Sequence, residues 1–379
     1  MADREAEIVA RIARGVSALA PAQWDALAGS VDPFVGHAFL SLLEASGSVG
    51  EGTGWTPLPV LVERQGHVTA AAPAYLKAHS QGEYVFDHGW ADAWERAGAS
   101  YYPKLQVAVP FTPCVGSRLL GDDRNALLAA LETVTIQNGL SSTHITFLGE
   151  DDVMASQARG WLRRDGLQYH WLNRGYSSFD DFLAGLSSRK RKSIRKERAA
   201  AVEDIEIVTL RGQEIEPCHW DAMWHFYQHT GARKWGRPYL TRAFFDLVGE
   251  TMGDSALMFL ALSDGRPIAG ALNFIRADTL YGRYWGAIEE RAFLHFELSY
   301  YRAIEWAIER GFKSIQAGAQ GEHKLARGYE PVVTPSVHFL PDAGFRRAVA
   351  DFLEREGEAV RLELEWARQA LPYRSVSSS

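Results

Sequence analysis

The sequence contains little cysteine and no long apolar run. Its 379 residues include only two cysteines, Cys114 and Cys218, which is too few for a disulfide framework. No apolar stretch approaches the roughly 20 residues that span a bilayer. The first residues also lack the basic stretch and apolar run of an export signal. We therefore expect reduced cysteines and a cytoplasmic protein, and leave open a peripheral contact with the inner membrane.

The sequence signatures of four common enzyme classes are also missing. No GxGxxG or GxxxxGK[ST] segment follows an expected strand, which argues against a dinucleotide or Walker-type phosphate site. There is no GxSxG nucleophile elbow. His225 and His229 share a helical face, but Phe226 stands where a metalloprotease helix would carry glutamate. We expect neither a metal site nor a bound cofactor.

The charge balance is slightly acidic, and aromatic residues are frequent. The chain has 40 Lys and Arg against 47 Asp and Glu, a net charge of −7, so any anion-binding site must be local. Twelve Trp, 14 Tyr and 18 Phe suit bulky cores and also apolar clefts that hold long ligands. The overall composition is that of a folded globular protein.

The apolar periodicity predicts a mixed α/β chain of two domains, 1–175 and 176–379. In the first domain we expect two early helices, a pair of strands and, over 102–114, an edge strand or shaped loop, since this stretch contains three prolines. A helix over 123–137, a strand over 143–148, a helix over 152–163 and a strand over 169–172 follow. The early elements span 22–29, 37–46, 58–63 and 68–76.

The second domain is expected to begin with a basic helix and to repeat the earlier order of elements. A strand over 205–210 precedes two helices, a three-strand meander, a helix over 294–309 with an apolar stripe, and a short strand over 314–316. A last strand over 332–340 and a long helix over 345–368 complete the chain. The two helices span 220–230 and 241–251, and the meander spans 257–262, 268–275 and 279–287.

The segment after the strand 314–316 carries the densest group of candidate catalytic residues. Glycines there let backbone N–H groups approach a ligand closely. We interpret His323 as a general base, with Glu322 to orient it or to replace it. A tight turn with solvated charges is the alternative. The residues expected to bind donor or substrate here are Gly318, Gln320, Gly321, Lys324 and Arg327.

A second candidate lies on the strand 280–286, where aromatic residues alternate with Gly and Arg. Strand alternation predicts Tyr281, Arg283 and Trp285 on one face and Tyr284 on the other. An arginine between aromatic residues calls for an anionic partner, which favours a binding role for Arg283 and Trp285. A partly exposed edge strand is the alternative. His295 and Glu297 follow at the start of the next helix and are further candidate catalytic residues.

Two weaker candidates remain. Seven basic residues lie within ten positions over 189–198, and either bind an anion or form a solvated helix face. Tyr101 and Lys104 either shape a substrate wall or simply pack. The residues of the expected anion-binding arm are Arg191, Lys192, Arg195 and Lys196.

These segments carry a family resemblance. The chain resembles the bacterial FemAB-like "peptidoglycan biosynthesis/recognition" family, a predicted N-acyltransferase branch of the GNAT superfamily. Membership would imply two tandem GNAT-like domains, and the order of elements in the second half agrees with that fold. The segments that carry the resemblance are 101–105, 109–113, 188–196, 282–286, 295–297 and 318–324.

The resemblance implies N-acyl transfer from an activated donor, acyl-CoA or a similar thioester, to an amine. A lipid amine such as a sphingoid base is one acceptor that it leaves open. A Fem-type transferase that uses aminoacyl-tRNA on peptidoglycan precursors is one alternative. A non-catalytic module that binds an acyl group, a glycan or the membrane is the other.

Overall fold

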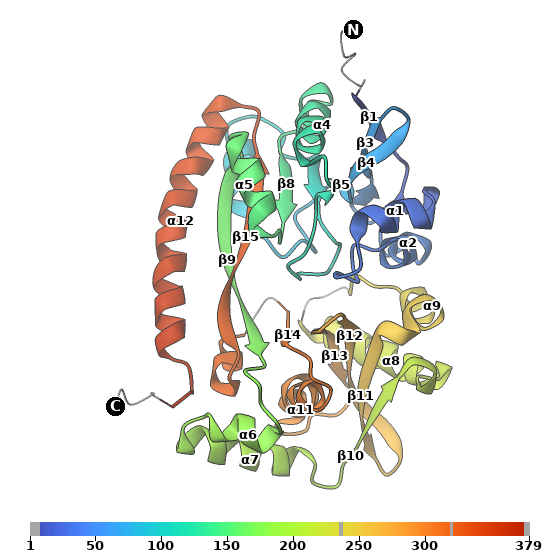
Figure 1. Cartoon of the computed structure of the whole chain (residues 1–379), viewed down its shortest axis with the longest axis vertical. Coiled ribbons are helices and arrows are strands. Elements are labelled where there is room, and N and C mark those ends of the chain that lie inside the picture. The colour runs from blue at the N-terminus through green and yellow to red at the C-terminus, as the bar shows by residue number, and fades with distance from the viewer. Residues whose placement is uncertain (1–7, 235–237, 319–320, 375–379) are drawn as a thin grey trace. The chain divides into compact units, whose positions relative to one another are not determined.

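The computed structural model describes residues 8–234, 238–318 and 321–374, which form two compact units. Unit 1 takes Met1–Gly166 and Val333–Arg361, and unit 2 takes Leu167–Val332 and Leu362–Ser379. The strands β9 (Leu162–Leu172) and β15 (Glu330–Phe339) begin in one unit and end in the other (Figure 1).

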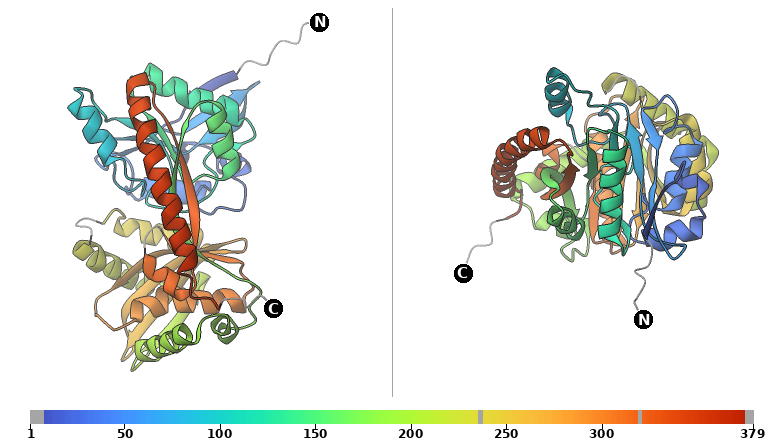
Figure 2. Two further views of the ribbon diagram at one scale, coloured as in Figure 1. Left: turned by 90° about the vertical axis from the view of Figure 1, so that its left-hand side faces the viewer. Right: turned by 90° about the horizontal axis from the view of Figure 1, so that it is seen from above.

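The expected boundary therefore needs a correction, because part of the C-terminal region belongs to unit 1. The end of β15 pairs with β8 (Thr143–Thr146) over Ser336–Phe339. The helix α12 (Ala343–Gln369) is continuous over 27 residues (Figure 2). In its first turns, Phe345 and Val349 share an apolar cluster with Trp90 and Tyr101. These contacts form between residues about 190 positions or more apart in the sequence, which is beyond the reach of local periodicity.

Unit 1 contains two sheets with helices against them. The small sheet has the strand order β1-β3-β4-β7, and the larger one runs β15-β8-β6-β5-β2 within this unit. One face of the larger sheet packs on α4 in an apolar core that includes Leu105, Leu127 and Ile145. The elements are β1 (Ile8–Ile12), α1 (Pro21–Ala28), α2 (His37–Ala45), β2 (Trp55–Pro57), β3 (Val60–Arg64), β4 (His67–Ala72), β5 (Ala74–Lys77), α3 (His88–Arg96), β6 (Lys104–Val107), β7 (Leu120–Gly121), α4 (Arg124–Gln137), β8 and α5 (Glu150–Ala158).

The proline-rich stretch of unit 1 was assigned to an edge strand or loop, and this is wrong for its middle. The strand β6 pairs with β5 on one side and with β8 on the other. Pro103 and Pro110 flank the four residues of β6 rather than interrupt them, so every residue of the strand keeps its N–H. The helix α3 was not predicted.

Unit 2 is built on one sheet with the strand order β10-β11-β12-β13-β14-β9 within the unit. The predicted meander is confirmed, and the predicted helix over 294–309 is interrupted by a π-helical turn at Glu297–Tyr301. The elements are α6 (Phe179–Ala184), α7 (Ser188–Ala201), β10 (Glu206–Arg211), α8 (Pro217–Lys234), α9 (Arg242–Met252), β11 (Ala256–Ser263), β12 (Arg266–Arg276), β13 (Thr279–Ala287), α10 (Leu294–Phe296), α11 (Arg302–Glu309) and β14 (Ser314–Gln316).

The two units share an order of elements, and the mixed α/β class is confirmed. In each, a strand and a helix pair precede antiparallel strands, and a helix then crosses to a parallel strand. That parallel pair is β6 with β8 in unit 1 and β13 with β14 in unit 2. The repeated order supports an internal duplication. Within the described residues, no helix has both the length and the apolar character needed to cross a bilayer.

Candidate functional site

The candidate site of unit 2 lies where two parallel strands part. β13 pairs with β14 only from Thr279 to Tyr281, and β14 then ends at Gln316 while β13 continues to Ala287. A cavity of about 160 Å³ lies at this parting. Its lining comes from β12, β13, the helical segment after β13 and the residue after β14: Ala271, Leu272, Asn273, Gly282, Arg283, Tyr284, Trp285, His295, Ser299, Tyr300 and Ala317.

A β-bulge on β13 shapes one wall of the cavity. Leu272 pairs with Tyr284 and Asn273 with Gly282, so Arg283 is the extra residue. The bulge reverses the alternation beyond it, and Trp285 shares a sheet face with Gly282 rather than with Tyr281. The separation of Tyr284 from Trp285 was predicted correctly, whereas the shared face of Tyr281 and Trp285 was wrong.

The π-helical turn supplies the opposite wall. A π turn widens the helix by one residue and is frequent at functional sites. Glu297 begins the turn and is fully buried, and its carboxylate accepts ion-paired contacts of 2.9 Å from both Arg198 and Arg302. Glu297 does not line the cavity. Glu297, which was predicted as an alternative base, therefore stabilises the π turn through its two ion pairs.

Two histidines and a tyrosine lie close together here: His295 and Tyr300 line the cavity, and His323 contacts Tyr300. The Tyr300 hydroxyl lies 2.9 Å from His323 Nε2, and the His295 and His323 rings are 6.1 Å apart. His295 also lies 5.0 Å from the Trp285 ring. Burial raises the pKa of Tyr300 to about 12, so its hydroxyl stays protonated at neutral pH and can donate. The structure therefore brings together four of the predicted site residues: Arg283, Trp285, His295 and His323. Tyr300 was not among the predicted site residues.

Two basic residues of the glycine-rich segment are used within the protein. Lys324 is 1% exposed, and its ammonium donates to the carbonyl oxygens of Ala317 at 2.6 Å and Gly318 at 2.8 Å. Arg327 donates to the His323 carbonyl oxygen and to Glu197, both at 2.8 Å. Through these hydrogen bonds, Lys324 and Arg327 stabilise the conformation of the segment that carries His323. Gly321 precedes it at φ +123°, a conformation that favours glycine. Gln320 and the side chain of Glu322 lie outside the described residues.

The basic segment forms the helix α7, as predicted, and this helix has two different sides. Lys192 and Lys196 are exposed, and Arg195 pairs at 2.8 Å with Asp180 on the surface. Arg191, the fourth residue of the expected arm, is half-buried. On the inner side, Ile194 is buried and Arg198 pairs with Glu297 and Glu305.

The inner side of α7 was missed in the sequence. Glu197 accepts from the Tyr301 hydroxyl at 2.5 Å and from Arg327 at 2.8 Å, so the helix is tied to the π turn and to the His323 segment. Arg198 lies four residues after the only strongly apolar residue of the basic run, Ile194, and therefore shares its helical face. That spacing was the available signal.

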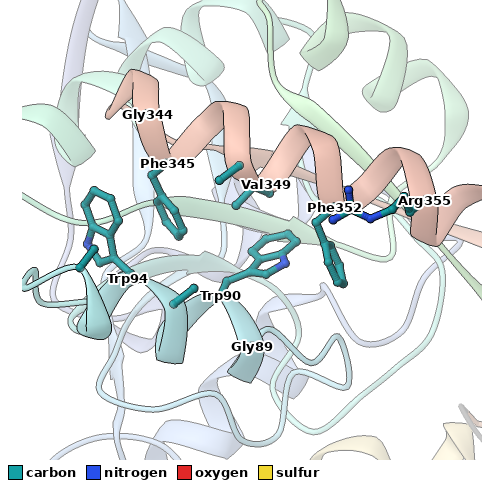
Figure 3. A pocket seen from close by; sticks show the side chains of 11 residues that line it. Gly89, Trp90, Trp94, Gly344, Phe345, Val349, Phe352 and Arg355 are labelled. Atoms are coloured by element: carbon teal, nitrogen blue, oxygen red, sulfur yellow. The ribbon is translucent and has the colours of Figure 1, made fainter.

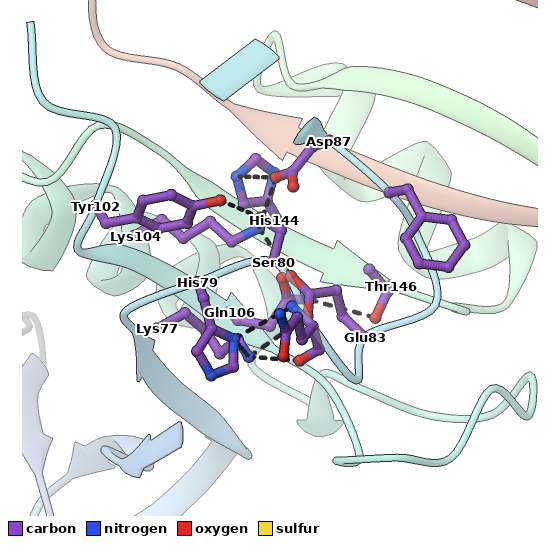
Figure 4. Close-up of polar contacts among 12 residues, drawn as sticks. Lys77, His79, Ser80, Glu83, Asp87, Tyr102, Lys104, Gln106, His144 and Thr146 are labelled. Carbon is purple, nitrogen blue, oxygen red and sulfur yellow. Dashed lines mark hydrogen bonds and ion pairs between the residues drawn. The ribbon is translucent and has the colours of Figure 1, made fainter. Parts of the chain in front are cut away.

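Tyr101 and Lys104 lie in the interior of unit 1. Figure 4 shows the polar contacts of Lys104. Lys104 is fully buried and donates to Ser80 at 2.8 Å, Glu83 at 2.9 Å and Asp87 at 2.6 Å. The Tyr101 hydroxyl, also buried, donates to the same Asp87 oxygen at 2.6 Å. The reading of these two residues as a substrate wall is wrong, because neither side chain reaches the surface.

This buried network covers one face of the larger sheet. Gln106 pairs across the strands with His144, and His144 with His338, whose Nδ1 atoms lie 2.6 Å apart. Burial lowers the pKa of Lys77 to about 7 and that of His144 to about 3. Burial alone would raise the pKa of Asp87, but the ammonium of Lys104 holds it well below its ordinary value. The network therefore keeps Asp87 charged and His144 neutral at pH 7.

Buried neutral histidines predict a loss of stability in mild acid. Burial, with a smaller effect of Lys324, lowers the pKa of His170 in unit 2 to about 4. The unfolded chain binds protons from about pH 6.5 downward and the folded chain does not, so the free energy of unfolding falls as the pH falls. We expect a loss of about 3 kcal/mol at pH 4 from His170 alone. Urea unfolding at pH 7, 5.5 and 4.5 measures the slope, and His170→Gln should flatten it; an unchanged slope in that variant would contradict the assignment.

Unit 1 also has an apolar groove of about 430 Å³ between α3 and the start of α12 (Figure 3). Trp90, Trp94, Phe345 and Phe352 line it, and Arg355 at one end is its one charged lining residue. The groove thus contains no candidate general base and no nucleophile for group transfer. The candidate catalytic groups lie in unit 2.

The comparisons with known proteins agree with this architecture. The family model FemAB-like, described as peptidoglycan biosynthesis/recognition, matches residues 15–375, and the chain belongs to this family. The resemblance stated from the sequence is confirmed. No curated protein sequence matches the chain.

Two solved structures with TM-scores above 0.5 show the same fold at low identity. The structure of FemX is 12% identical with a TM-score of 0.53 and covers 88% of this chain and 98% of its own. A conserved protein of unknown function from Bacteroides thetaiotaomicron is 11% identical with a TM-score of 0.52, covering 87% and 99%. A tandem GNAT protein from the clavulanic acid pathway is 13% identical with a TM-score of 0.47, covering 88% and 98%. Membership of the FemAB-like family supports a transferase of acyl or aminoacyl groups.

Proposed function

We propose that unit 2 is an N-acyltransferase that moves an acyl group from a thioester donor, acyl-CoA or a similar compound, to an amine. The observation that carries this proposal is the cavity at the parting of β13 and β14, with the hydrogen-bonded pair of Tyr300 and His323 beside it. A base and an acid next to a small cavity are the groups that this reaction requires.

The residues allow a balanced sequence of proton transfers. The amine nitrogen attacks the thioester carbonyl carbon, and a C–N bond forms as the C–S bond breaks. His323 takes the proton that the attacking nitrogen releases. Tyr300 gives a proton to the leaving sulfur and regains one from His323 along their 2.9 Å contact. The products are an amide and a thiol, and both side chains return to their starting states.

The open edge of β13 supports a donor with an extended, amide-containing arm. Beyond Tyr281, β14 provides no partner strand for β13, and an unpaired strand edge binds extended chains through main-chain hydrogen bonds. Acyl-CoA has such an arm. The cavity of about 160 Å³ at the parting of the strands would take the reacting end of such a donor. A long acyl chain would extend out of it.

Transfer of an aminoacyl group from tRNA is the second candidate. It is favoured by the exposed basic face of α7, where Lys192 and Lys196 are available for phosphates. The acceptor would then be a peptidoglycan precursor, in keeping with the family description. Peripheral attraction to an anionic membrane would use the same face.

A donor panel tests the proposal. Purified protein is examined by native mass spectrometry with acetyl-CoA, palmitoyl-CoA and aminoacyl-tRNA, and by product formation on amines that include a sphingoid base and an amino sugar. We expect binding and turnover with short acyl-CoA that ribonuclease leaves unchanged. Lys192→Glu with Lys196→Glu should then have no effect on turnover. Turnover that ribonuclease and this double variant both abolish would instead establish the tRNA-dependent reaction, and binding of no donor would contradict transfer by either route.

A further inference from the structure

Ser299 differs from its polar neighbours in the π turn. Its Oγ is buried and has no hydrogen-bond partner among the described residues, and the residue is part of the cavity lining. The other polar side chains of the turn are engaged, Glu297 by Arg198 and Arg302, Tyr300 by His323, and Tyr301 by Glu197.

A buried hydroxyl without a partner is costly and calls for a reason. Most buried polar side chains are hydrogen-bonded, and an unsatisfied one loses its hydration without compensation. A serine within a helix ordinarily bonds back to the carbonyl oxygen four residues earlier. Ser299 makes no such bond to His295. The hydroxyl is therefore available to a group that enters the cavity.

Asn273, another neutral side chain with a donor group in the cavity lining, is committed elsewhere. The Asn273 amide donates to the carbonyl oxygens of Leu257 and Ala271, both at 3.3 Å. Tyr300 lies next to Ser299 in the sequence, and both line the cavity. The turn thus presents two neighbouring hydroxyls, of which one is paired with His323 and the other is free to donate.

We infer that the Ser299 hydroxyl donates a hydrogen bond to the acyl carbonyl oxygen of the donor, and strengthens it as that oxygen gains negative charge during attack. This inference rests on the proposed function and adds a catalytic residue to it. It assigns the two hydroxyls different roles: Ser299 stabilises the developing oxyanion, and Tyr300 protonates the leaving sulfur. A preorganised donor at an oxyanion accelerates transfer because it acts mainly in the transition state.

The role predicts an unusual combination of effects for Ser299→Ala. With the donor identified by the panel, kcat should fall about 10²–10³-fold, while KM changes less than about threefold because the interaction strengthens mainly in the transition state. The thermal midpoint should stay the same or rise, since the substitution removes a buried hydroxyl that has no partner. Ser299→Thr keeps the hydroxyl and should restore most of the lost rate.

Ser314→Ala is the matched control. The Ser314 hydroxyl lies 2.9 Å from Thr279 Oγ1 at the paired end of β13 and β14, away from the cavity lining. Its loss should lower the thermal midpoint slightly and leave kcat unchanged, the reverse of the pattern for Ser299. If the wild-type protein transfers acyl groups and Ser299→Ala keeps kcat within threefold, the role of Ser299 is overturned and the transferase stands. A marked fall in the thermal midpoint of Ser299→Ala would also overturn it, and a wild-type protein without transfer would overturn both.

Discussion

Replacing His323 with alanine is expected to lower the rate of acyl transfer by about 10²–10⁴-fold, the range that a positioned general base contributes. The ring is exposed and its imidazole nitrogen lies 2.9 Å from the hydroxyl of Tyr300, so the substitution removes a proton acceptor without opening a core cavity. The folded state should keep its unfolding midpoint within about 2 °C, because surface substitutions seldom change stability much. Steady-state rates and a thermal melt on the same preparation measure both effects.

Two further variants separate the base from its neighbours. Tyr300→Phe keeps the packing of the ring and removes the hydroxyl, and should slow release of the thiol more than binding of the donor. His295→Gln should have a smaller effect than His323→Ala, since the Tyr300 hydroxyl lies 2.9 Å from His323 and the His295 ring lies against the Trp285 ring. Near-normal turnover in His323→Ala would remove His323 from the mechanism.

The candidate site was only partly visible in the sequence, and the reasons are physical. His323, Arg283 and Trp285 could be selected because glycine-rich turns and an arginine among aromatic residues are unusual in local sequence. Their meeting could not be predicted, because it depends on where β14 ends beside β13. The π turn cannot be recognised from an apolar stripe, since Phe296 and Ile304 continue the stripe on both sides of it.

Charge patterns were less informative than their residue types suggested. Lys324 and Arg327 are residues typical of a phosphate site, but both are buried and donate hydrogen bonds to carbonyl oxygens of their own segment. Glu297 is of a residue type that can act as a base, but its carboxylate forms ion pairs with two guanidinium groups. Arg198 lies 99 residues from Glu297, beyond the reach of sequence patterns. For Lys324 and Arg327 the carbonyl partners are near in sequence, and it is burial that makes these charges bond to the protein rather than to solvent.

The fold shows the same division between local and distant information. The meander and the helices α4, α7 and α9 follow from periodicity, and the structure has them where we expected them. The short strand β6 was misjudged because prolines were counted across the whole stretch rather than at its ends. The assignment of Val333–Arg361 to unit 1 depends on strand pairing over nearly 200 residues.

Replacing Lys104 with alanine is expected to destabilise the protein by about 3–5 kcal/mol, the usual cost of removing one partner from a buried ion pair. Glu83 and Asp87 are each 3% exposed, and the Lys104 ammonium contacts both carboxylates within 3 Å. Without it, two buried carboxylates share the remaining cation, Lys77, which lies 3.4 Å from Glu83. Urea unfolding at pH 7 measures the loss, and Lys192→Ala on the exposed face of α7 is the matched control, with an expected change within about 0.5 kcal/mol.

The loss should be recoverable by removing the charges that Lys104 neutralises. Lys104→Met combined with Glu83→Gln and Asp87→Asn keeps the volume of the side chains and leaves no opposed charge, so the triple variant should regain much of the lost stability. The same measurement separates a structural role from a role in the reaction. If Lys104 only stabilises unit 1, the rate per folded molecule is unchanged in Lys104→Ala at a temperature where the variant remains folded. A rate that falls with the protein fully folded would contradict this assignment, and so would a variant as stable as the wild type.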